Sequence, residues 1–328
     1  MQLIDLVEIY FTKNWNWEEL SRNKNINWND IHNFPYFKWE KKYLILNPNI
    51  TWDIITSPNY LNTKWFYDKS DFAGNENITL DIIQDNNIKW NYNLLSSNSK
   101  ITMNYIEENI TQKWNWNEIA LNPNLTFDFI LNNLDKKLNW IYISAHKCIT
   151  WKIIIDNINL PWDWSGISYN SNITWNIIIN NLEYPWDWSS LSRNPNITFY
   201  IIKNNNHYNW DWQEISANDN ITLDIINNNN EYNWDFVFFH FNNNINPQII
   251  QDNIEMNWNF YLLSENPMTE PYNNFNYNLY SQKRQDQTTI FVNNIKDELL
   301  QYTWHPNRVF DWCFDNNAKQ NIKKRFIL

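Results

Sequence analysis

Histidine and cysteine are the residues with which this sequence could perform nucleophilic or metal chemistry, and they are few: 5 His and 2 Cys among 328 residues. Cys313 follows His305 by eight residues, which would allow a Cys–His nucleophile pair, but isolated Cys and His with apolar neighbours favour a structural role. The histidines have no second ligand at metal-binding spacing, and Gly74 and Gly166 are too isolated for a phosphate-binding loop. The sequence therefore predicts no catalytic, cofactor-binding or metal-binding residues.

The elements that would position any functional side chain come from a tandem repeat. A Trp recurs every 24 residues from Trp90 to Trp258, and Leu138 replaces it at one step. Eleven residues after each comes a branched apolar residue, usually followed by Thr, as in Ile173-Thr174. Earlier Trp residues extend the series back to Trp15, which gives about eleven units. A fixed period of this length is typical of repeat architectures.

Each unit is predicted to form two short helices. The first begins at the Thr, because its hydroxyl accepts from backbone N–H groups of the first helical turn. The second begins at an Asn or Asp three residues before a Glu, as in Asn115 and Glu118, which resembles a capping box. Both helices should end at a recurrent Asn, since Asn tolerates the left-handed conformation of helix ends. Helices this short must gain stability by stacking on neighbouring units.

The β-solenoid is the alternative to a helical repeat. Ile, Trp, Phe, Tyr and Thr favour strands, and Asn suits the corners of such a fold. However, the apolar residues of a unit are adjacent, as in Ile177 and Ile178, whereas a half-buried strand alternates apolar and polar residues. Helices are therefore favoured, and the predicted fold is an all-α, right-handed-type α-solenoid of about eleven 24-residue units.

The paired Trp residues of a unit are predicted to belong to the core. Trp186 and Trp188 are two residues apart, and side chains with this spacing cannot share one face of a helix. We expect one of them to pack inside its own unit and the other against the next unit. A binding face lined by Trp is the alternative.

Three regions follow from the limits of the repeat register. Residues 1–14 are predicted as an N-terminal capping helix, residues 15–269 as the repeats, and residues 270–328 as a C-terminal cap or docking module. The last region contains the stretch WHPNRVFDWC, which either seals the last repeat or docks to a partner. Aromatic residues and arginine dominate the energetics of interfaces. The candidate anchors in this region are Tyr302, Trp304, Arg308 and Trp312.

Within the repeats, the candidate contacts to a partner are positions that vary while the Trp, Ile and Asn positions hold. They are Lys64, Lys89, Lys113, Lys137, Glu183 and His207.

Composition argues against several classes of function. The formal net charge of −11 is unsuited to nucleic acid, whose phosphates require clustered Lys and Arg. The first residues include Asp5 and Glu8 and do not resemble a signal peptide, and no apolar run is long enough to span a membrane. Two cysteines fit a reducing compartment. We therefore expect no nucleic acid and no membrane as partners.

The phrase NPNITW, followed by WDW and by LSxNPNIT, resembles the tandem-repeat proteins of giant, mimivirus-like DNA viruses. The similarity covers residues of about 15–269, and the C-terminal stretch is similar to the tails of such proteins. The resemblance implies a viral origin and a location in the host cytoplasm or the virion. It implies no reaction and no functional residue.

Three functions remain as hypotheses. The leading one is a non-enzymatic scaffold that binds a host or viral protein, because stacked repeats create an extended surface. The second is a structural component of the virion. The third is an adaptor for a host ubiquitin ligase, in which the C-terminal module binds the ligase and the repeats select the substrate.

Overall fold

The computed structural model describes residues 1–57, 69–84 and 88–268, and within them every regular element is a helix and none is a strand. This confirms the prediction of an all-α repeat solenoid. Residues 2–270 group into one compact unit. The predicted C-terminal module, residues 270–328, lies outside the described residues. No described helix has the length and apolar character that a membrane crossing requires.

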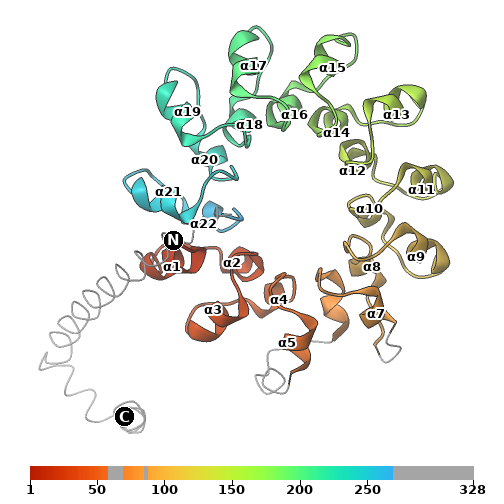
Figure 1. Cartoon of the computed structure of the whole chain (residues 1–328), viewed down its shortest axis with the longest axis vertical. Helices are drawn as coiled ribbons and strands as arrows, with labels where there is room; N and C mark the ends of the chain where they lie inside the picture. Colours follow the sequence, from red (N-terminus) through yellow and green to blue (C-terminus); the bar gives the residue numbers. More distant parts are fainter. Residues whose placement is uncertain (58–68, 85–87, 269–328) are drawn as a thin grey trace, which may run out of the picture. The chain divides into compact units, whose positions relative to one another are not determined.

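The helices alternate between two concentric layers around a central opening (Figure 1). The outer layer is formed by α1 (Leu3–Ile9), α3 (Trp28–Asn33), α5 (Trp52–Thr56), α7 (Leu80–Ile83), α9 (Met103–Glu108), α11 (Phe127–Asn132), α13 (Trp151–Asp156), α15 (Trp175–Ile179), α17 (Phe199–Asn204), α19 (Leu223–Asn228) and α21 (Pro247–Asp252).

The inner layer is formed by α2 (Trp17–Arg22), α4 (Lys41–Leu44), the 3-10 helix η1 (Lys69–Gly74), α8 (Tyr92–Leu95), α10 (Trp116–Ile119), α12 (Trp140–Ala145), α14 (Trp164–Tyr169), α16 (Trp188–Arg193), α18 (Trp212–Ser216), α20 (Phe236–Phe239) and α22 (Phe260–Leu263). One outer helix and the inner helix that follows it make one unit, so the described residues contain eleven units.

The repeats close into a ring, because the first unit packs on the last. Helix α1 contacts α21, and the Tyr10 hydroxyl donates to Gln251 Oε1 at 3.2 Å. The indole of Trp15 packs edge-on against the ring of Phe260, 4.9 Å away. Helix α1 is therefore the outer helix of the first unit and the surface that receives the last one. We call this junction the seam.

The predicted helix starts are confirmed. The Thr174 hydroxyl accepts from the backbone N–H of Ile177 at the start of α15, and Asp187 Oδ1 accepts from that of Ser190 at the start of α16. The predicted capping box is wrong in one respect. The backbone N–H of Asn115, which a capping box would give to Glu118, donates instead to Ser96 Oγ of the preceding unit. The same Ser-to-cap bond joins most neighbouring units.

The recurrent Asn ends the inner helices, but the left-handed conformation predicted for it is wrong. Among the described residues only Met268 combines a side chain with a positive φ, and Asn194 is extended, with φ −63° and ψ 132°. Its buried amide instead donates to the carbonyls of Ser168 and Asn170 in the preceding unit. The Asn is therefore required for the bond between units rather than for its own backbone conformation.

Ten of these Asn amides, with the imidazole of His146 at the eleventh position, form a ladder that runs round the whole ring. Each one donates to backbone carbonyls of the preceding unit, and Asn23 of the first unit donates to the carbonyl of Asn266 in the eleventh. The members are Asn23, Asn47, Asn75, Asn98, Asn122, His146, Asn170, Asn194, Asn218, Asn242 and Asn266. We call this set the Asn ladder.

The Trp pairs pack as predicted, one within its unit and one against the next. Trp186 Nε1 donates to the carbonyl of Asn181 in the same unit at 2.8 Å. Trp164 of the preceding unit meets Trp186 edge-on at 5.3 Å and stacks on Tyr184 at 5.1 Å. The same arrangement recurs one unit later, where Trp188 stacks on Tyr208 at 4.2 Å.

Candidate binding site on the inner helices

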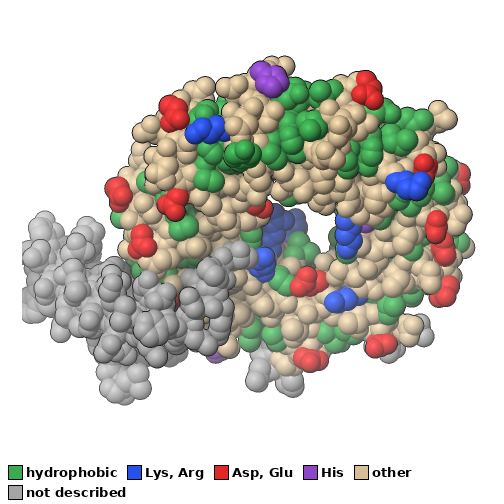
Figure 2. All heavy atoms as spheres, turned by 45° about the horizontal axis from the view of Figure 1, so that its top comes forward, with side chains coloured by type: hydrophobic (Ala, Val, Ile, Leu, Met, Phe, Trp, Pro, Cys, Tyr) green, Lys and Arg blue, Asp and Glu red, His purple; other side chains and the backbone are tan. Residues whose placement is uncertain are grey.

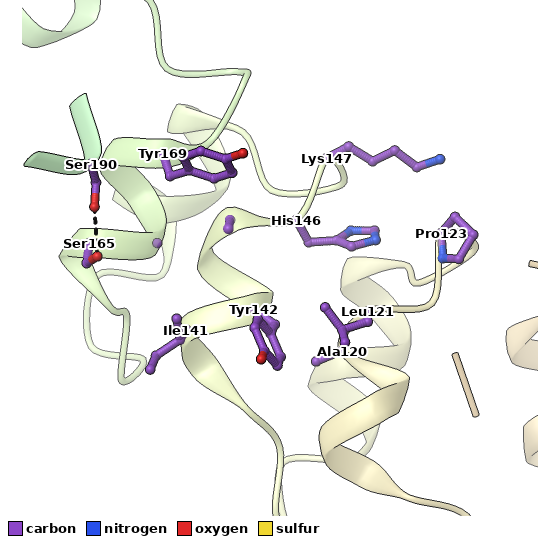
Figure 3. Close-up of a pocket in the computed structure, with 12 residues that line it drawn as sticks. Ala120, Leu121, Pro123, Ile141, Tyr142, His146, Lys147, Ser165, Tyr169 and Ser190 are labelled. Carbon is purple, nitrogen blue, oxygen red and sulfur yellow. Dashed lines mark hydrogen bonds between the residues drawn. The ribbon is translucent and has the colours of Figure 1, made fainter. Parts of the chain in front are cut away.

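An apolar hollow lies on the inner layer of the ring, where α10, α12, α14 and α16 follow one another (Figure 3). Its volume is about 600 Å³. It is lined by Ala120, Leu121, Pro123, Ile141, Tyr142, Ala145, His146, Lys147, Ser165, Gly166, Tyr169 and Ser190. Figure 2 shows that the centre of the ring is open and that Lys and Arg side chains lie beside the opening.

The apolar side chains of the hollow are exposed because of their positions in the inner helices. Ile143 and Ser144 of α12 point into the packed ring and are fully buried. Ile141 and Tyr142, at the start of the same helix, lie on its other side and are 54 % and 41 % exposed. Nothing in the packing of the ring requires apolar residues there, since the equivalents of Ile141 in the neighbouring units are polar.

Gly166 brings α12 and α14 close together at the edge of the hollow. A Cβ at this position would lie 2.4 Å from the carbonyl oxygen of Ile141 and 2.9 Å from Ser144 Cβ. No side chain fits at such distances, so the absence of a Cβ sets the spacing of the two helices. On the next interface the Ser165 and Ser190 hydroxyls are hydrogen-bonded at 2.8 Å.

His146 stands in the Asn ladder at the position of an Asn. Its Nε2 faces the carbonyl of Asn122 at 3.1 Å, while Nδ1 accepts from the backbone N–H of Cys148 at 3.2 Å and lies 3.0 Å from the thiol. Burial, opposed by the bond to Asn122, lowers the pKa of His146 below its ordinary value of 6.5. Burial also raises the pKa of the Cys148 thiol to about 11.

This His–Cys contact has the wrong electrostatics for a nucleophile. A reactive cysteine requires a lowered pKa and access to solvent, whereas that of Cys148 is raised. Both nitrogens of His146 are engaged by the backbone, so the pair replaces the two Asn residues of other units. Among the residues placed in the structure, no three His, Cys, Asp or Glu side chains gather as metal ligands would. The arrangement can bind an apolar group beside a cation, Lys147, whose side chain extends away from the hollow (Figure 3).

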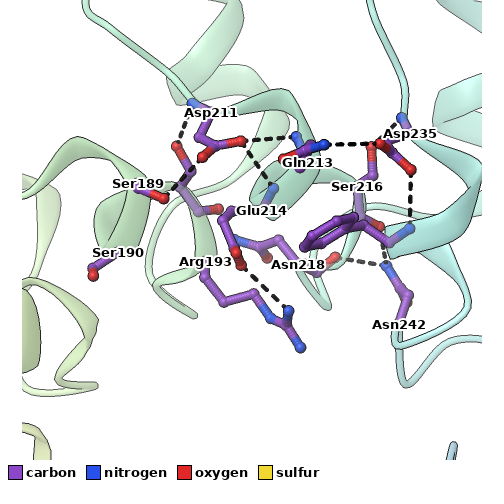
Figure 4. A network of polar contacts seen from close by, with 12 residues as sticks. Ser189, Ser190, Arg193, Asp211, Gln213, Glu214, Ser216, Asn218, Asp235 and Asn242 are labelled. Atoms are coloured by element: carbon purple, nitrogen blue, oxygen red, sulfur yellow. Dashed lines mark hydrogen bonds and ion pairs between the residues drawn. The ribbon is translucent and has the colours of Figure 1, made fainter.

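Next to the hollow, the helices α16 and α18 of the inner layer carry polar side chains that are hydrogen-bonded between units (Figure 4). Ser189 Oγ donates to Asp211 Oδ2 at 2.8 Å, and Gln213 Nε2 donates to Asp235 Oδ2 at 3.3 Å. Arg193 of α16 and Glu214 of α18 form an ion pair at 3.4 Å. These polar side chains are hydrogen-bonded or ion-paired to one another, whereas the apolar side chains of the hollow are exposed.

The candidate contacts predicted within the repeats do not converge on the hollow. Lys113, Lys137, Glu183 and His207 are all exposed, and each lies in a loop that joins an outer helix to the next inner helix. Lys137 lines a second hollow of about 300 Å³ with Trp114 and Trp116. The His207 ring lies 4.2 Å from that of Tyr208.

Lys89 is also exposed in such a loop. The other predicted contacts lie outside the described residues. These are Lys64, Tyr302, Trp304, Arg308 and Trp312.

The sequence analysis missed the apolar hollow because it sought variable positions only in the loops. A comparison of the inner helices would have found it. Ile141 occupies the second position of its helix, where the neighbouring units have Asn117, Ser165 and Ser189.

No protein-family model, curated protein or solved structure matches the chain.

Proposed function

We propose that the ring is a non-enzymatic scaffold that binds a segment of another protein on its inner layer. The single observation that carries this proposal is the apolar hollow, in which Leu121, just after α10, Ile141 and Tyr142 of α12, and Tyr169 of α14 are exposed. Apolar groups gathered in a concave site favour ligand binding, and tyrosines contribute large contact areas at low entropic cost.

The chemistry of the hollow specifies the kind of segment. Its apolar lining suits an aliphatic or aromatic side chain, and Lys147 at its edge favours an acidic neighbour in the partner. The non-enzymatic character is supported by Cys148, whose raised pKa does not suit a nucleophile, and by His146, whose two ring nitrogens are engaged by the backbone. A giant-virus origin would make the partner a host or viral protein.

The experiment is a site-directed photo-crosslink. A benzophenone amino acid replaces Tyr142 in the full chain, which is expressed in the host cell and irradiated, and adducts are identified by mass spectrometry. We expect one predominant protein adduct. The variant Ile141→Asp should abolish the adduct while the ring stays folded, because Ile141 is exposed.

The matched control is Val237→Asp. Val237 occupies the equivalent position of α20, is exposed, and lies outside the hollow. This variant should retain the adduct. Equal loss in both variants, or no adduct with any protein, would contradict a binding site in the hollow.

A further inference from the structure

The junction between α10 and α12 is held by fewer hydrogen bonds than the junction that follows it. Between α12 and α14, the amides of Asn170 and Asn172 and the hydroxyl of Ser144 take part in six hydrogen bonds between units. The units of α10 and α12 are both fully described, and one hydrogen bond joins them, between His146 Nε2 and the carbonyl of Asn122 at 3.1 Å.

Substitutions in the repeat account for this difference. Ala120 stands where most units have Ser, so the Ser-to-cap bond is absent. Cys148 stands where most units have an Asn such as Asn172, whose amide donates to two carbonyls of the preceding unit. His146 makes one bond to the preceding unit, whereas Asn170 at the equivalent position makes three. The α10–α12 junction therefore lacks most of the polar contacts that join other units.

The aromatic contact between units is altered at the same junction. Trp140 of α12 meets Trp162 of the next unit edge-on at 5.3 Å, as other units do. Leu138 replaces the Trp that Trp116 of α10 would meet in this way. Trp116 stacks instead on Phe129 of the outer helix α11, at 6.1 Å. The two inner helices are therefore not joined by an indole pair.

The apolar hollow adjoins this junction and leaves room for movement. Ala120 and Leu121 line it at the end of α10, and Tyr142 lines it from α12 (Figure 3). A shift of α10 against α12 would therefore compress few packed side chains there. On its other side α12 is held close to α14, because Gly166 leaves no space between the two helices.

The weakly bonded junction lies opposite the seam. Five units precede it and six follow it, and α10 and α12 lie across the central opening from α1 and α22 (Figure 1). The seam is where the ring closes without a connecting loop, since it joins the first unit to the eleventh. In a repeat array each unit contacts only its neighbours, so the interfaces between units determine where the array bends. If the seam separates, the bend should be concentrated at the interface with the fewest bonds.

We infer that the ring opens at the seam by bending at the α10–α12 junction, so that the first five units and the last six move apart as two arms. Opening gives a lateral route to the inner layer. The inference does not depend on the proposed function of the hollow.

Electron–electron double resonance between two spin labels on the full chain measures the opening. The labels are attached at Thr12→Cys and Glu231→Cys, which are two units apart across the seam, after Cys148→Ser and Cys313→Ser remove the native thiols. The reference pair is Glu183→Cys with Glu231→Cys, also two units apart but within one arm. All three labelled positions are exposed and equivalent in the repeat, so both pairs should give the same distance in the closed ring.

The seam is then weakened by Asn23→Ala and Asn25→Ala, which remove the amides that donate to Asn266 and Met268. We expect a second, longer distance for the pair across the seam and none for the reference pair. Circular dichroism should show that the helices remain.

Repair of the junction tests the position of the bend. Ala120→Ser, His146→Asn and Cys148→Asn introduce the side chains that bond other units, so they should reduce the fraction with the longer distance about fivefold or more. The matched control is Ala73→Ser with Lys100→Asn, which makes the same kinds of change between η1 and α8 and should leave that fraction unchanged.

A single distance in the chain with the weakened seam overturns the inference, because the ring would then stay closed. A longer distance in the reference pair also overturns it, as does an equal effect of the two repairs, because the bend would then be spread along the ring.

Discussion

The side-chain amide of Asn23 donates to the backbone carbonyl of Asn266 at 3.0 Å, although 243 residues separate the two in sequence. Inside the ring, the amide of Asn194 donates to the backbone carbonyl of Asn170 at the same distance of 3.0 Å, between equivalent atoms of neighbouring units. The seam repeats a second internal contact as well, since the backbone N–H of Asn16 donates to Ser264 Oγ. The first unit therefore follows the eleventh as any unit follows its predecessor.

Loss of an amide inside the Asn ladder should destabilise the whole ring. In Asn194→Ala the carbonyl of Ser168 and the backbone N–H of Asn196 lose their partner, and the carbonyl of Asn170 keeps only its bond from the backbone N–H of Ile173. Each unsatisfied buried group costs on the order of 1–3 kcal/mol, so the free energy of unfolding should fall by about 2 kcal/mol or more. Urea denaturation measures it. Asn230→Ala, at an exposed position, should change stability by less than about 0.5 kcal/mol.

The matched substitution at the seam, Asn23→Ala, should act locally. It removes the bond to Asn266, so we expect the amides of α1, α2, α21 and α22 to exchange hydrogen sooner than those of the remaining units. Native-state hydrogen exchange measures this order. If hydrogen exchange became faster by the same factor in all units, the seam would be no weaker than the interfaces inside the ring.

Acid should destabilise the ring through two histidines, the buried His240 and the half-buried His146. His240 Nε2 accepts from the backbone N–H of Asn259 at 2.7 Å, in place of the Ser hydroxyl of other units, so His240 must be neutral there. Burial lowers its pKa below 6.5, although its hydrogen bonds to the backbone and the negative charge of Asp235 oppose this. Since the unfolded chain binds the proton more readily, this stability is present above about pH 6.5 and is lost as the pH falls through the lowered pKa.

The measurement is the urea midpoint at about pH 7.5 and about pH 5. The variants His240→Ser and His146→Asn restore the residues that other units have at these positions, and both should reduce the fall in the midpoint at acid pH. An unchanged fall in the double variant would assign the acid sensitivity to carboxylates instead.

The two glycines of the chain should respond differently to a methyl group. In Gly166→Ala the new Cβ would clash with the backbone of α12, which cannot move without separating α12 from α14. Overpacking of this kind costs about 1–3 kcal/mol. In Gly74→Ala the nearest atom is the end of the flexible Leu46 side chain at 3.3 Å, so the cost should be small. Thermal unfolding of the two variants compares them, and equal losses would contradict the close approach at Gly166.

The helical unit could be predicted from sequence because its signals are local. Thr174 and Asp187 are side-chain caps whose chemistry is complete within three residues, and the spacing of Trp186 and Trp188 determines that they face different neighbours. The role of the ladder Asn could not be inferred in the same way. An Asn at a helix end suits both a left-handed cap and a bond to the preceding unit, and only the neighbouring unit distinguishes the two.

Closure of the ring depends on a property that no single unit contains. The small rotation between neighbours must add up to a full turn over eleven units, so Asn23 and Asn266 meet only through the sum of all the interfaces. One substitution in the Asn ladder and one in the Ser-to-cap bonds can be recognised in the sequence. When the units are aligned, His146 stands where most others have Asn, and His240 where most others have Ser. Each of these histidines takes part in a bond between units, so the alignment also identifies the two positions expected to respond to acid.

The contact between Tyr10 and Gln251 tests the closed ring most directly. Tyr10→Cys and Gln251→Cys would be combined in a chain whose own cysteines are replaced, Cys148→Asn and Cys313→Ser, and treated with a short thiol-reactive cross-linker. A control pairs Tyr10→Cys with Lys152→Cys on α13, which is nearer in sequence but lies across the ring (Figure 1).

Closure predicts an intramolecular cross-link between positions 10 and 251 in the monomer and none between positions 10 and 152. If positions 10 and 251 fail to cross-link, or do so only between molecules, the chain is an open solenoid and the account of the seam is wrong.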